Sequence, residues 1–314
     1  MPSLSGDQHS IVNASQRAVV TEVGASLRAY EVAGTAICWG FDEDELPTGG
    51  RGQVLAPWPN RIEDGTYRFD GLDAKAPLDE PERHNAIHGL VRWMSFQLSA
   101  RGESFVRLAT VLRPQPAYPF DLRLEVEYRL VASGLEVTTT ATNIGWRRAP
   151  FGLGFHDYLD AGPRGVDQVL VDLHATRRLV LDDRLLPVGI EEVAGTPYEV
   201  LRSKPSSPAP IGALRLDDCF TGLQADASGR WHADIVRGEG PHDRLTLWAD
   251  QAFGWLMVFS GDSLEPAQRR RALAIEPMTC PPNAFRSGEG LVVLDAGASF
   301  SATWGIEPSG LTPA

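Results

Sequence analysis

The sequence predicts an all-β protein built from antiparallel sheets with few short helices, and two observations support this prediction. The first is an alternation of apolar and polar residues, which places one set of side chains on each face of an extended strand. It is clearest in residues 122–130, LRLEVEYRL, where every second residue is apolar and the residues between them are Arg or Glu. The second is the content of 31 glycines and 23 prolines among 314 residues. Glycine and proline together thus exceed the roughly 12% that they make up in average proteins. Frequent turns between many strands require such a content.

Several further segments repeat the two-residue period, and each of them predicts a strand. They are residues 106–112, 135–142, 244–248, 255–259 and 300–306. Residues 67–72, YRFDGL, place an Asp-Gly pair between apolar residues, which predicts a β-hairpin. The best helix candidate is the short segment 262–274, whose arginine run predicts an exposed position, either as a solvated face or as an interaction patch.

The chain is expected to form one domain over residues 1–314. Its length would allow two ordinary domains, but all-β units often exceed 200 residues. The sequence contains no linker-like low-complexity segment and no internal repeat of 20–50 residues. We expect a single large β domain, with residues 1–16 as a loosely ordered lead.

Composition excludes several classes of partner. Lys and Arg number 29 against 41 Asp and Glu, so the formal net charge is −12, and nucleic acid would be repelled by the average surface. No run of 18 apolar residues predicts a membrane span, and the N-terminus lacks the basic start and apolar stretch of a secretion signal. These features predict a cytoplasmic protein, either monomer or homodimer, that binds no nucleic acid and no membrane.

Cysteine spacing and short motifs argue against a metal or cofactor. Cys38, Cys219 and Cys280 are odd in number and widely spaced, which disfavours a disulfide framework and a zinc site. The chain contains neither an H-E-x-x-H motif nor a G-x-x-x-x-G-K phosphate loop. We therefore expect no metal and no cofactor.

Polar residues set among glycine, proline and aromatic residues are the candidates for chemistry. In residues 55–67, LAPWPNRIEDGTY, two prolines stiffen the chain before Asn60 and Arg61. The planar guanidinium of Arg61 could grip two oxygens of a polyol or carboxylate, or it could tie down a loop carbonyl. In residues 83–93, RHNAIHGLVRW, His88 precedes a glycine, which allows a ligand or another backbone to approach closely.

Two further candidates supply acid–base groups. His156 follows two glycines in FGLGFHDYLD, residues 151–160, and this stretch alone does not distinguish a catalytic from a structural histidine. Glu276 comes at the end of an apolar run in residues 273–285, LAIEPMTCPPNAF, where prolines begin a loop. An apolar neighbourhood raises the pKa of a carboxyl toward neutrality, as a general base requires, but a salt-bridged strand-end glutamate would fit equally well.

Five stretches together resemble the aldose 1-epimerase, or galactose mutarotase, family, in its bacterial mutarotase-like branch. They are APWPNRI, HNAIHGLVRW, FGLGFHDYL, LDDCF and IEPMTCPPNAF, in the order and with the spacing that this family shows, over roughly residues 17 to 306. The resemblance implies an antiparallel β-supersandwich with a monosaccharide substrate in an open cleft. It agrees with the alternation of apolar and polar residues.

The resemblance also implies residue roles. Glu276 would remove the proton of the anomeric hydroxyl, His156 would give a proton to the ring oxygen, and His88 would hydrogen-bond that oxygen. The residues that would bind sugar hydroxyls are Asn60, Arg61 and Asp217. These roles describe the interconversion of α and β anomers of an aldohexose by acid–base ring opening.

Two positions depart from the family pattern. The family often has Asp-His-x-Phe where this chain has LDDCF, so position selects Asp217 but leaves Asp218 open. Close relatives often have proline after the second histidine, and Asp157 stands there instead. If its side chain met His156, the carboxylate would favour the protonated imidazolium.

Two other functions remain open at this stage. The first is a sugar-binding or sensing protein that keeps the cleft without turnover, although binding alone needs no acid opposite a base. The second is a mutarotase for a phosphorylated or sulfonated sugar, which would need extra cations in the cleft. Candidates for these cations are Arg92, Arg147 and Arg286.

Overall fold

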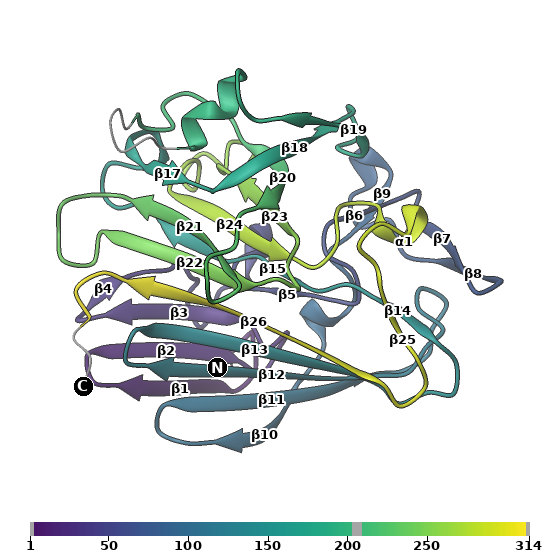
Figure 1. Ribbon diagram of the computed structural model, residues 1–314. Coiled ribbons are helices and arrows are strands. Elements are labelled where there is room, and N and C mark those ends of the chain that lie inside the picture. Colours follow the sequence, from purple (N-terminus) through teal and green to yellow (C-terminus); the bar gives the residue numbers. More distant parts are fainter. Residues whose placement is uncertain (1–2, 203–208, 312–314) are drawn as a thin grey trace.

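The computed structural model describes residues 3–202 and 209–311, and most strands of this part belong to two eight-stranded antiparallel sheets (Figure 1). The first, which we call the long sheet, has the strand order β10-β11-β12-β13-β26-β22-β21-β17. Its strands are β10 (Gln97–Arg101), β11 (Phe105–Leu112), β12 (Leu122–Val131), β13 (Gly134–Asn143), β26 (Ser299–Pro308), β22 (Arg244–Asp250), β21 (Arg230–Val236) and β17 (Leu170–Asp172).

The second sheet, which we call the site sheet, carries the candidate catalytic residues on or beside its strands. Its order is β19-β18-β20-β23-β24-β15-β5, and β16 also pairs with β24. The strands are β19 (Pro187–Glu192), β18 (Ala175–Leu181), β20 (Asp217–Leu223), β23 (Trp255–Phe259), β24 (Ala272–Met278), β15 (Gly154–Phe155), β5 (Val54–Leu55) and β16 (Tyr158–Asp160).

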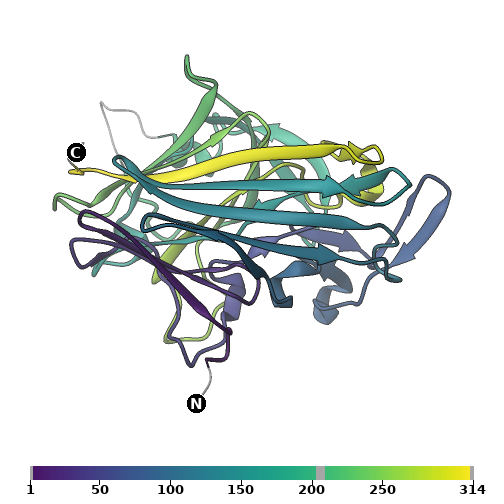
Figure 2. The same cartoon turned by 90° about the horizontal axis from the view of Figure 1, so that it is seen from below.

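A four-stranded sheet at the N-terminal end packs against the long sheet. It consists of β1 (Gln8–Asn13), β2 (Gln16–Thr21), β3 (Leu27–Val32) and β4 (Thr35–Ala36). Viewed from below, these strands form a layer that crosses the long strands (Figure 2). The expectation of a loosely ordered lead over residues 1–16 is therefore wrong from Gln8 onward. Strand β1 pairs along its whole length with β2, and Ile11 is fully buried in the core.

The remaining elements are three two-stranded ladders and short helical turns. The ladders are β6 (Arg61–Glu63) with β9 (Asn85–Ile87), β7 (Thr66–Phe69) with β8 (Leu72–Lys75), and β14 (Ala149–Phe151) with β25 (Val292–Leu294). The 3₁₀ turns are η1 (Thr48–Gly50), η2 (Pro81–Arg83), η3 (Val91–Trp93), η4 (Val166–Gln168) and η5 (Pro197–Leu201). The α-helix of the described part is α1 (Ala284–Ser287). Within the same residues, no helix has the length and apolar character needed to cross a membrane.

The predicted strands and the predicted hairpin are confirmed, but the predicted helix over residues 262–274 is not. The Asp-Gly hairpin joins β7 and β8, and both turn residues have the positive φ such a turn requires, 46° at Asp70 and 81° at Gly71. Residues 262–271 form turns instead of a helix. Arg270 has a left-handed φ of 51°, which does not fit a right-handed helix, and its guanidinium is held by Asp167 and Asp262.

The main core lies between the sheets, and the alternation seen in the sequence accounts for it. Along β12 every second residue is buried and the others are half-exposed. The ring of Phe155, from the site sheet, lies 5.0 Å from the ring of Trp304, from the long sheet. Strand β24 is buried along its entire length because Leu273 and Ile275 face this core while the alternate residues face the covered outer side. The outer face of β24 is where the candidate site lies.

Tyr128 ties the long sheet to the loop after β2, and its removal provides a test of the core. Its hydroxyl donates to the carbonyl of Ala25 at 2.7 Å, and both residues are fully buried. We expect Tyr128→Phe to lower the free energy of unfolding by about 1–3 kcal/mol, because a buried carbonyl loses its partner. Urea denaturation of both proteins measures the difference, and an unchanged midpoint would show that this bond does not stabilise the fold.

Candidate active site

Glu276 lies on β24 with its side chain on the outer face of the site sheet. Glu276 pairs with Met257 of β23, and it is only 2% exposed. Burial raises the pKa of Glu276 well above its ordinary value, and the nearby carboxylate of Asp217 raises it further. The direction agrees with the expectation from the apolar sequence around it. Burial therefore favours the protonated form of Glu276 in the free protein.

His156 is wedged beside Glu276 between a tyrosine ring and a glycine backbone. Its ring stacks on Tyr158 with centroids 5.1 Å apart. A side chain at Gly50 would place its Cβ 2.6 Å from the imidazole, so only glycine fits there. Nε2 of His156 lies 3.4 Å from Oε1 of Glu276. Burial, followed by the charges of Arg92 and Arg61, lowers the pKa of His156 to about 3.

His88 completes a cluster of three acid–base groups. Its ring centroid lies 5.2 Å from that of His156, at an interplanar angle of 74°. The backbone N–H of Asn60 donates to Nδ1 of His88 at 3.3 Å, and the N–H of His88 donates to the carbonyl of Asn60 at 2.9 Å. With Nδ1 accepting, the proton of the neutral ring is on Nε2, which can donate to a ligand. Burial lowers the pKa of His88 and keeps the ring neutral.

The glycine after His88 is required by a close approach of two backbones. Gly89 has φ of 71°, and a Cβ at this position would lie 2.1 Å from the carbonyl oxygen of Ala56. His88 and Asn60 themselves have left-handed φ values of 62° and 55°. The two loops that carry them are thus locked together by backbone geometry, which agrees with the close approach expected at this glycine.

Arg61 is buried and is held by an acidic residue that the sequence did not reveal. Its Nε and Nη2 donate to the two carboxylate oxygens of Glu80, each at 2.8 Å. Asn85 donates to the same carboxylate at 3.0 Å. The planar fork of Arg61 is therefore engaged by Glu80, and Nη2 also lies 4.0 Å from Oδ2 of Asp217. What remains for a ligand is the Nη1 edge, which makes a long bond of 3.4 Å to the side chain of Asn60.

Asp217, and not Asp218, lies on the side of the catalytic cluster. Asp217 pairs with Phe259 on β23, its side chain is 35% exposed, and burial raises its pKa although Arg61 opposes this effect. Asp218 is engaged by Arg178, from which its carboxylate accepts at 2.7 Å, and of the two aspartates it is Asp217 that shifts the pKa of Glu276. The alternation of β20 therefore leaves Asp217 as the carboxylate that a ligand near Glu276 can reach.

Asp157 does not act on His156 as the sequence suggested it would if the side chains met. The pKa of His156 is lowered, and Asp157 contributes no effect to it. Asp157 is 1% exposed, and neither carboxylate oxygen has a hydrogen-bond partner among the described residues. Because side chains alternate along extended chain, Asp157 faces the core while His156 and Tyr158 face the site.

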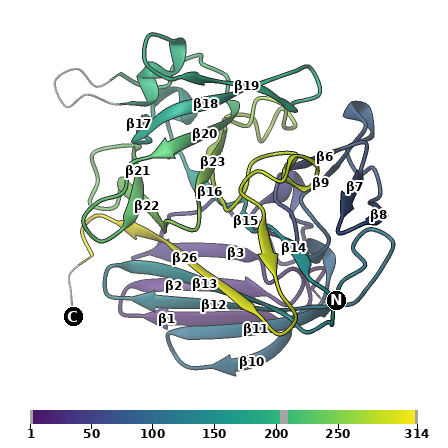
Figure 3. The same ribbon diagram turned by 45° about the vertical axis from the view of Figure 1, so that its right-hand side comes forward.

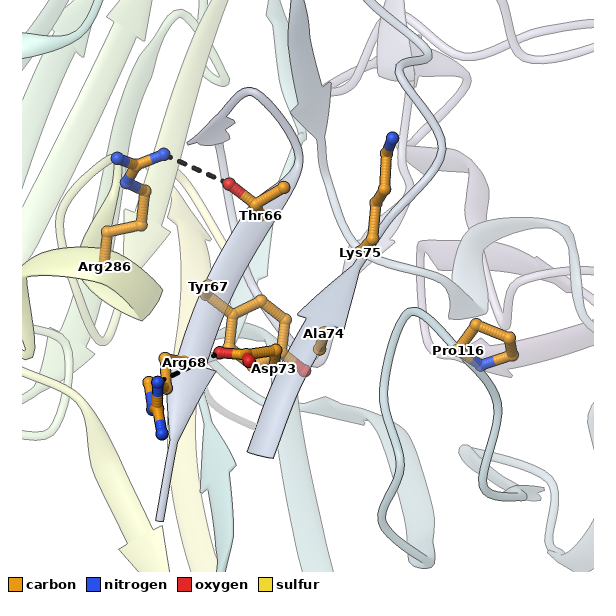
Figure 4. A pocket seen from close by; sticks show the side chains of 8 residues that line it. All are labelled: Thr66, Tyr67, Arg68, Asp73, Ala74, Lys75, Pro116 and Arg286. Atoms are coloured by element: carbon orange, nitrogen blue, oxygen red, sulfur yellow. Dashed lines mark hydrogen bonds and ion pairs between the residues drawn. The ribbon is translucent and has the colours of Figure 1, made fainter. Parts of the chain in front are cut away.

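One surface hollow lies away from these residues, at the β7–β8 hairpin. It measures about 700 Å³ and is lined by residues such as Tyr67, Lys75 and Arg286 (Figure 4). Arg286 donates there to the carbonyl of Glu63 at 3.0 Å, and Arg147 stacks at 4.1 Å over the ring of Trp146. Of the three arginines considered for an anionic sugar, only Arg92 is close enough to the histidines to shift their pKa.

The described residues contain no group of three or more His, Cys, Asp or Glu side chains that could hold a metal ion. The chemistry that the cluster itself supplies is proton transfer. One carboxyl, two imidazoles, an arginine and a second carboxylate lie close together next to β24.

Comparison with known proteins identifies the family. A family model for aldose 1-epimerase matches residues 7–307. The chain belongs to the aldose 1-epimerase family. It is therefore an isomerase of a family that acts on sugars, and the antiparallel all-β fold expected from the resemblance is confirmed.

Individual relatives support this assignment. The uncharacterized protein YihR of Escherichia coli K12 is 34% identical over 296 residues, which cover 93% of this chain and 90% of that protein. The maltose epimerase of Levilactobacillus brevis is 25% identical over 264 residues, covering 78% and 75% of the two chains. The crystal structure of a GalM/aldose epimerase homologue from C. elegans superposes with a TM-score of 0.81 at 19% identity, covering 96% and 99%. At that identity, the structural match shows the shared fold.

Several residues of the site escaped the sequence analysis. Glu80 is 19 positions from Arg61 in the chain, and no local pattern links the two. Gly50 belongs to the run TGGRG, whose glycine density was the signal available for a close approach. Tyr158 stood in the same stretch as His156, two residues later, where strand alternation places both side chains on one face.

The buried Asp157 predicts a pH dependence of stability. Burial raises its pKa to about 8, whereas an unfolded aspartate titrates near 3.9. Between these values the folded protein binds the proton more tightly than the unfolded chain. The stability that Asp157 gains from this tighter proton binding is complete below about pH 4. As pH rises from there toward 8, it decreases by up to ~1.4 kcal/mol per pH unit.

Asp157→Asn keeps the neutral form at every pH and so isolates this effect. We expect the Tm of the variant to exceed that of the unchanged protein by an amount that grows between pH 5 and pH 8. Thermal denaturation across this range measures it. A Tm difference that stays constant with pH would contradict a buried, titrating Asp157.

Proposed function

We propose that the protein is an aldose 1-epimerase that interconverts the α and β anomers of a neutral aldose, with Glu276 as base and His156 as acid. The observation that carries the proposal is the 3.4 Å separation of Nε2 of His156 and Oε1 of Glu276 on a shielded face of the site sheet. A base and an acid at this spacing can act on two oxygens of one sugar ring. His88 stands beside them as a neutral hydrogen-bond donor.

The proton movements balance without a cofactor. Glu276 takes the proton of the hydroxyl on C1 while His156 gives a proton to the ring oxygen, so the bond from C1 to that oxygen breaks and C1 becomes an aldehyde. Rotation about the C1–C2 bond turns the other face of the aldehyde toward the ring oxygen. The reverse transfers then close the ring as the other anomer and return both side chains to their starting states.

The catalytic pair must hold a single proton for this sequence. Burial favours neutral Glu276 and neutral His156 in the free protein, which is the state that the pair reaches after ring opening. Ring opening needs that proton on His156. The proton can pass directly from Glu276 to His156, since Oε1 and Nε2 are 3.4 Å apart. It can also pass through a sugar hydroxyl that lies between these two atoms.

The pattern of charges favours a neutral sugar over an anionic one. Arg61 is paired with Glu80, and Arg92 donates to Asp79 and to the carbonyl of Ile87. Each arginine near the histidines thus has a carboxylate partner. A phosphorylated or sulfonated sugar would have to compete with these carboxylates, so we place this substrate class second. The maltose epimerase that the chain resembles is named for an uncharged sugar.

A purely sugar-binding role is disfavoured by the chemistry of the cluster. A binding site gains nothing from burying Glu276 against His156, since burial of titratable groups costs free energy. The same burial shifts pKa values in the way that acid–base catalysis uses.

Replacement of the base provides the first test. Glu276→Gln keeps the shape of the side chain but cannot accept a proton, so we expect about 10²–10⁴-fold slower anomer exchange. NMR exchange rates of freshly dissolved α-D-glucose and α-D-galactose measure the effect, with α-D-glucose 6-phosphate as the charged comparison. Glu136→Gln, on the outer face of β13, is the matched control and should retain full activity. Near-full activity of Glu276→Gln would refute the assignment.

The lowered pKa of His156 predicts the shape of the pH profile. A second proton enters the pair only near pH 3, so kcat/KM should stay level as pH falls through 6.5, the ordinary pKa of histidine. The alkaline limb marks loss of the shared proton and lies above the ordinary pKa of glutamate, because burial raises the pKa of Glu276. Rates between about pH 5 and 7 check this; an acid limb near 6.5 would contradict it.

A further inference from the structure

The imidazole of His156 is oriented by packing and not by a hydrogen bond to its second nitrogen. Nδ1 of His156 has no hydrogen-bond partner among the described residues, although the partner of this nitrogen usually sets the orientation of a functional histidine. The ring instead lies between the stacked ring of Tyr158 and the backbone of Gly50, where no Cβ fits. The direction of Nε2 therefore depends on how Tyr158 and Gly50 are held.

Neither Tyr158 nor the turn that contains Gly50 is fixed by itself. Gly49 and Gly50 have left-handed φ values of 65° and 80°, and glycine loses more conformational freedom on folding than any other residue. Tyr158 lies on β16, which is labelled near β23 in Figure 3 and pairs with β24, the strand of Glu276. Its hydroxyl donates to the carbonyl of Gly49 at 2.8 Å. The two sides that enclose the imidazole are thus joined to each other, and an anchor outside them must hold both.

Arg51, the residue after these glycines, is this anchor. Its side chain is 3% exposed. Nη1 donates to the carbonyl of Gly40 at 2.8 Å, and Nε donates to the carbonyl of Thr48 at 3.2 Å. Nη2 donates to the hydroxyl of Thr48 at 2.9 Å and to the carboxylate of Glu45. One planar guanidinium therefore holds residues 40, 45 and 48 together and closes the loop that presents the two glycines to the imidazole.

The same guanidinium reaches Tyr158 through a second aromatic ring. Cζ of Arg51 lies 4.6 Å from the ring centroid of Trp39. The ring of Trp39 meets the ring of Tyr158 edge-on, with centroids 5.5 Å apart and an interplanar angle of 88°. A row of contacts thus runs from Arg51 through these two rings to His156, and such cation–ring and ring–ring contacts favour defined geometries.

The position of the imidazole, and not its charge state, is what Arg51 determines. The positive charges that lower the pKa of His156 are those of Arg92 and Arg61. A lysine at residue 51 would keep the positive charge, but its single ammonium group cannot span the acceptors that surround the guanidinium. Replacement of Arg51 by lysine therefore separates geometry from charge.

We propose that Arg51 is a positioning residue for His156 and acts on it through Gly50 and through the ring pair of Trp39 and Tyr158. Arg51 itself touches no substrate and moves no proton. This inference rests on the proposed role of His156 as the acid. It adds that the loop of residues 40–52 sets the direction in which the imidazole delivers its proton.

Two substitutions test the two routes from Arg51 to His156. Arg51→Lys removes the guanidinium, and Tyr158→Phe removes only the bond to Gly49 while it keeps the stacked ring. A displaced acid weakens proton transfer more than binding. We therefore expect kcat for anomer exchange of α-D-galactose to fall about tenfold for Arg51→Lys and about threefold for Tyr158→Phe, with KM changed less than about twofold.

Tyr128→Phe is the matched control for these variants. It also removes one bond from a buried tyrosine hydroxyl to a backbone carbonyl, at 2.7 Å, but this bond lies in the core. We expect it to lower stability and to leave kcat unchanged. A loss of kcat in Tyr128→Phe as large as that in Tyr158→Phe would show that stability alone accounts for the effect, which would overturn the inference.

The titration of His156 provides a readout that does not require turnover. Burial lowers the pKa of His156 to about 3, so its signal should not titrate between about pH 5 and 7 in the unchanged protein. Arg51→Lys retains the titratable and charged groups around the imidazole, which are Glu276, His88, Tyr158, Arg61 and Arg92. A loosened loop admits water, so we expect the pKa in this variant to rise toward 6.5. NMR of histidine-labelled protein measures it, with the signal identified by His156→Gln.

The outcomes distinguish this inference from the proposed function. In a protein that accelerates anomer exchange, an unchanged kcat of Arg51→Lys would overturn the positioning role and leave the proposed function standing. In a protein without anomer exchange, the proposed function fails, and the titration decides: a raised pKa of His156 in Arg51→Lys would retain the positioning role, and an unchanged pKa would overturn it as well. If Arg51→Lys does not fold, an unchanged kcat of Tyr158→Phe overturns the inference.

Discussion

The burial of Glu276 against His156 is the constraint on which the rest of the site depends. A carboxyl and an imidazole that are almost closed to water favour their neutral forms, and in those forms the pair holds one proton. Such a pair can take up and deliver a proton on the same ligand without a change in total charge. The fold provides this environment by placing β24 in the middle of the site sheet, where both of its faces are covered.

Backbone conformation, more than side-chain packing, brings the other groups to this pair. Left-handed residues at Asn60 and His88, and a glycine at 89 that meets the carbonyl of Ala56, fix two loops against each other. The reciprocal bonds between Asn60 and His88 then decide which nitrogen of the imidazole carries the proton. In this way a local backbone arrangement determines the hydrogen-bonding direction of a side chain that faces the site.

The sequence predicts the strands well because alternation is a local property that burial enforces one residue at a time. It also singles out Glu276 and His88, since apolar residues or a glycine next to a polar residue are visible in a short window. The structure places both side chains beside His156, and their catalytic roles stay predictions. It fails where distant segments decide the outcome. The partner of Arg61 is Glu80, from a separate turn. The last residues of the helix expected over 262–274 belong to β24, which pairs with strands distant in the sequence, and the residues before them form turns.

The arginine pairs explain how a site with several cations remains suited to an uncharged ligand. Arg61 and Arg92 lower the pKa of both histidines, so their field reaches the catalytic groups. Arg61 is paired with Glu80 and Arg92 with Asp79, so each of these positive charges has a negative partner. In the proposed function, a neutral sugar therefore meets no unpaired charge on these two arginines. In the proposed ring opening, the negative charge that develops on the ring oxygen as its bond to C1 breaks would meet a positive local field, which would stabilise the transition state.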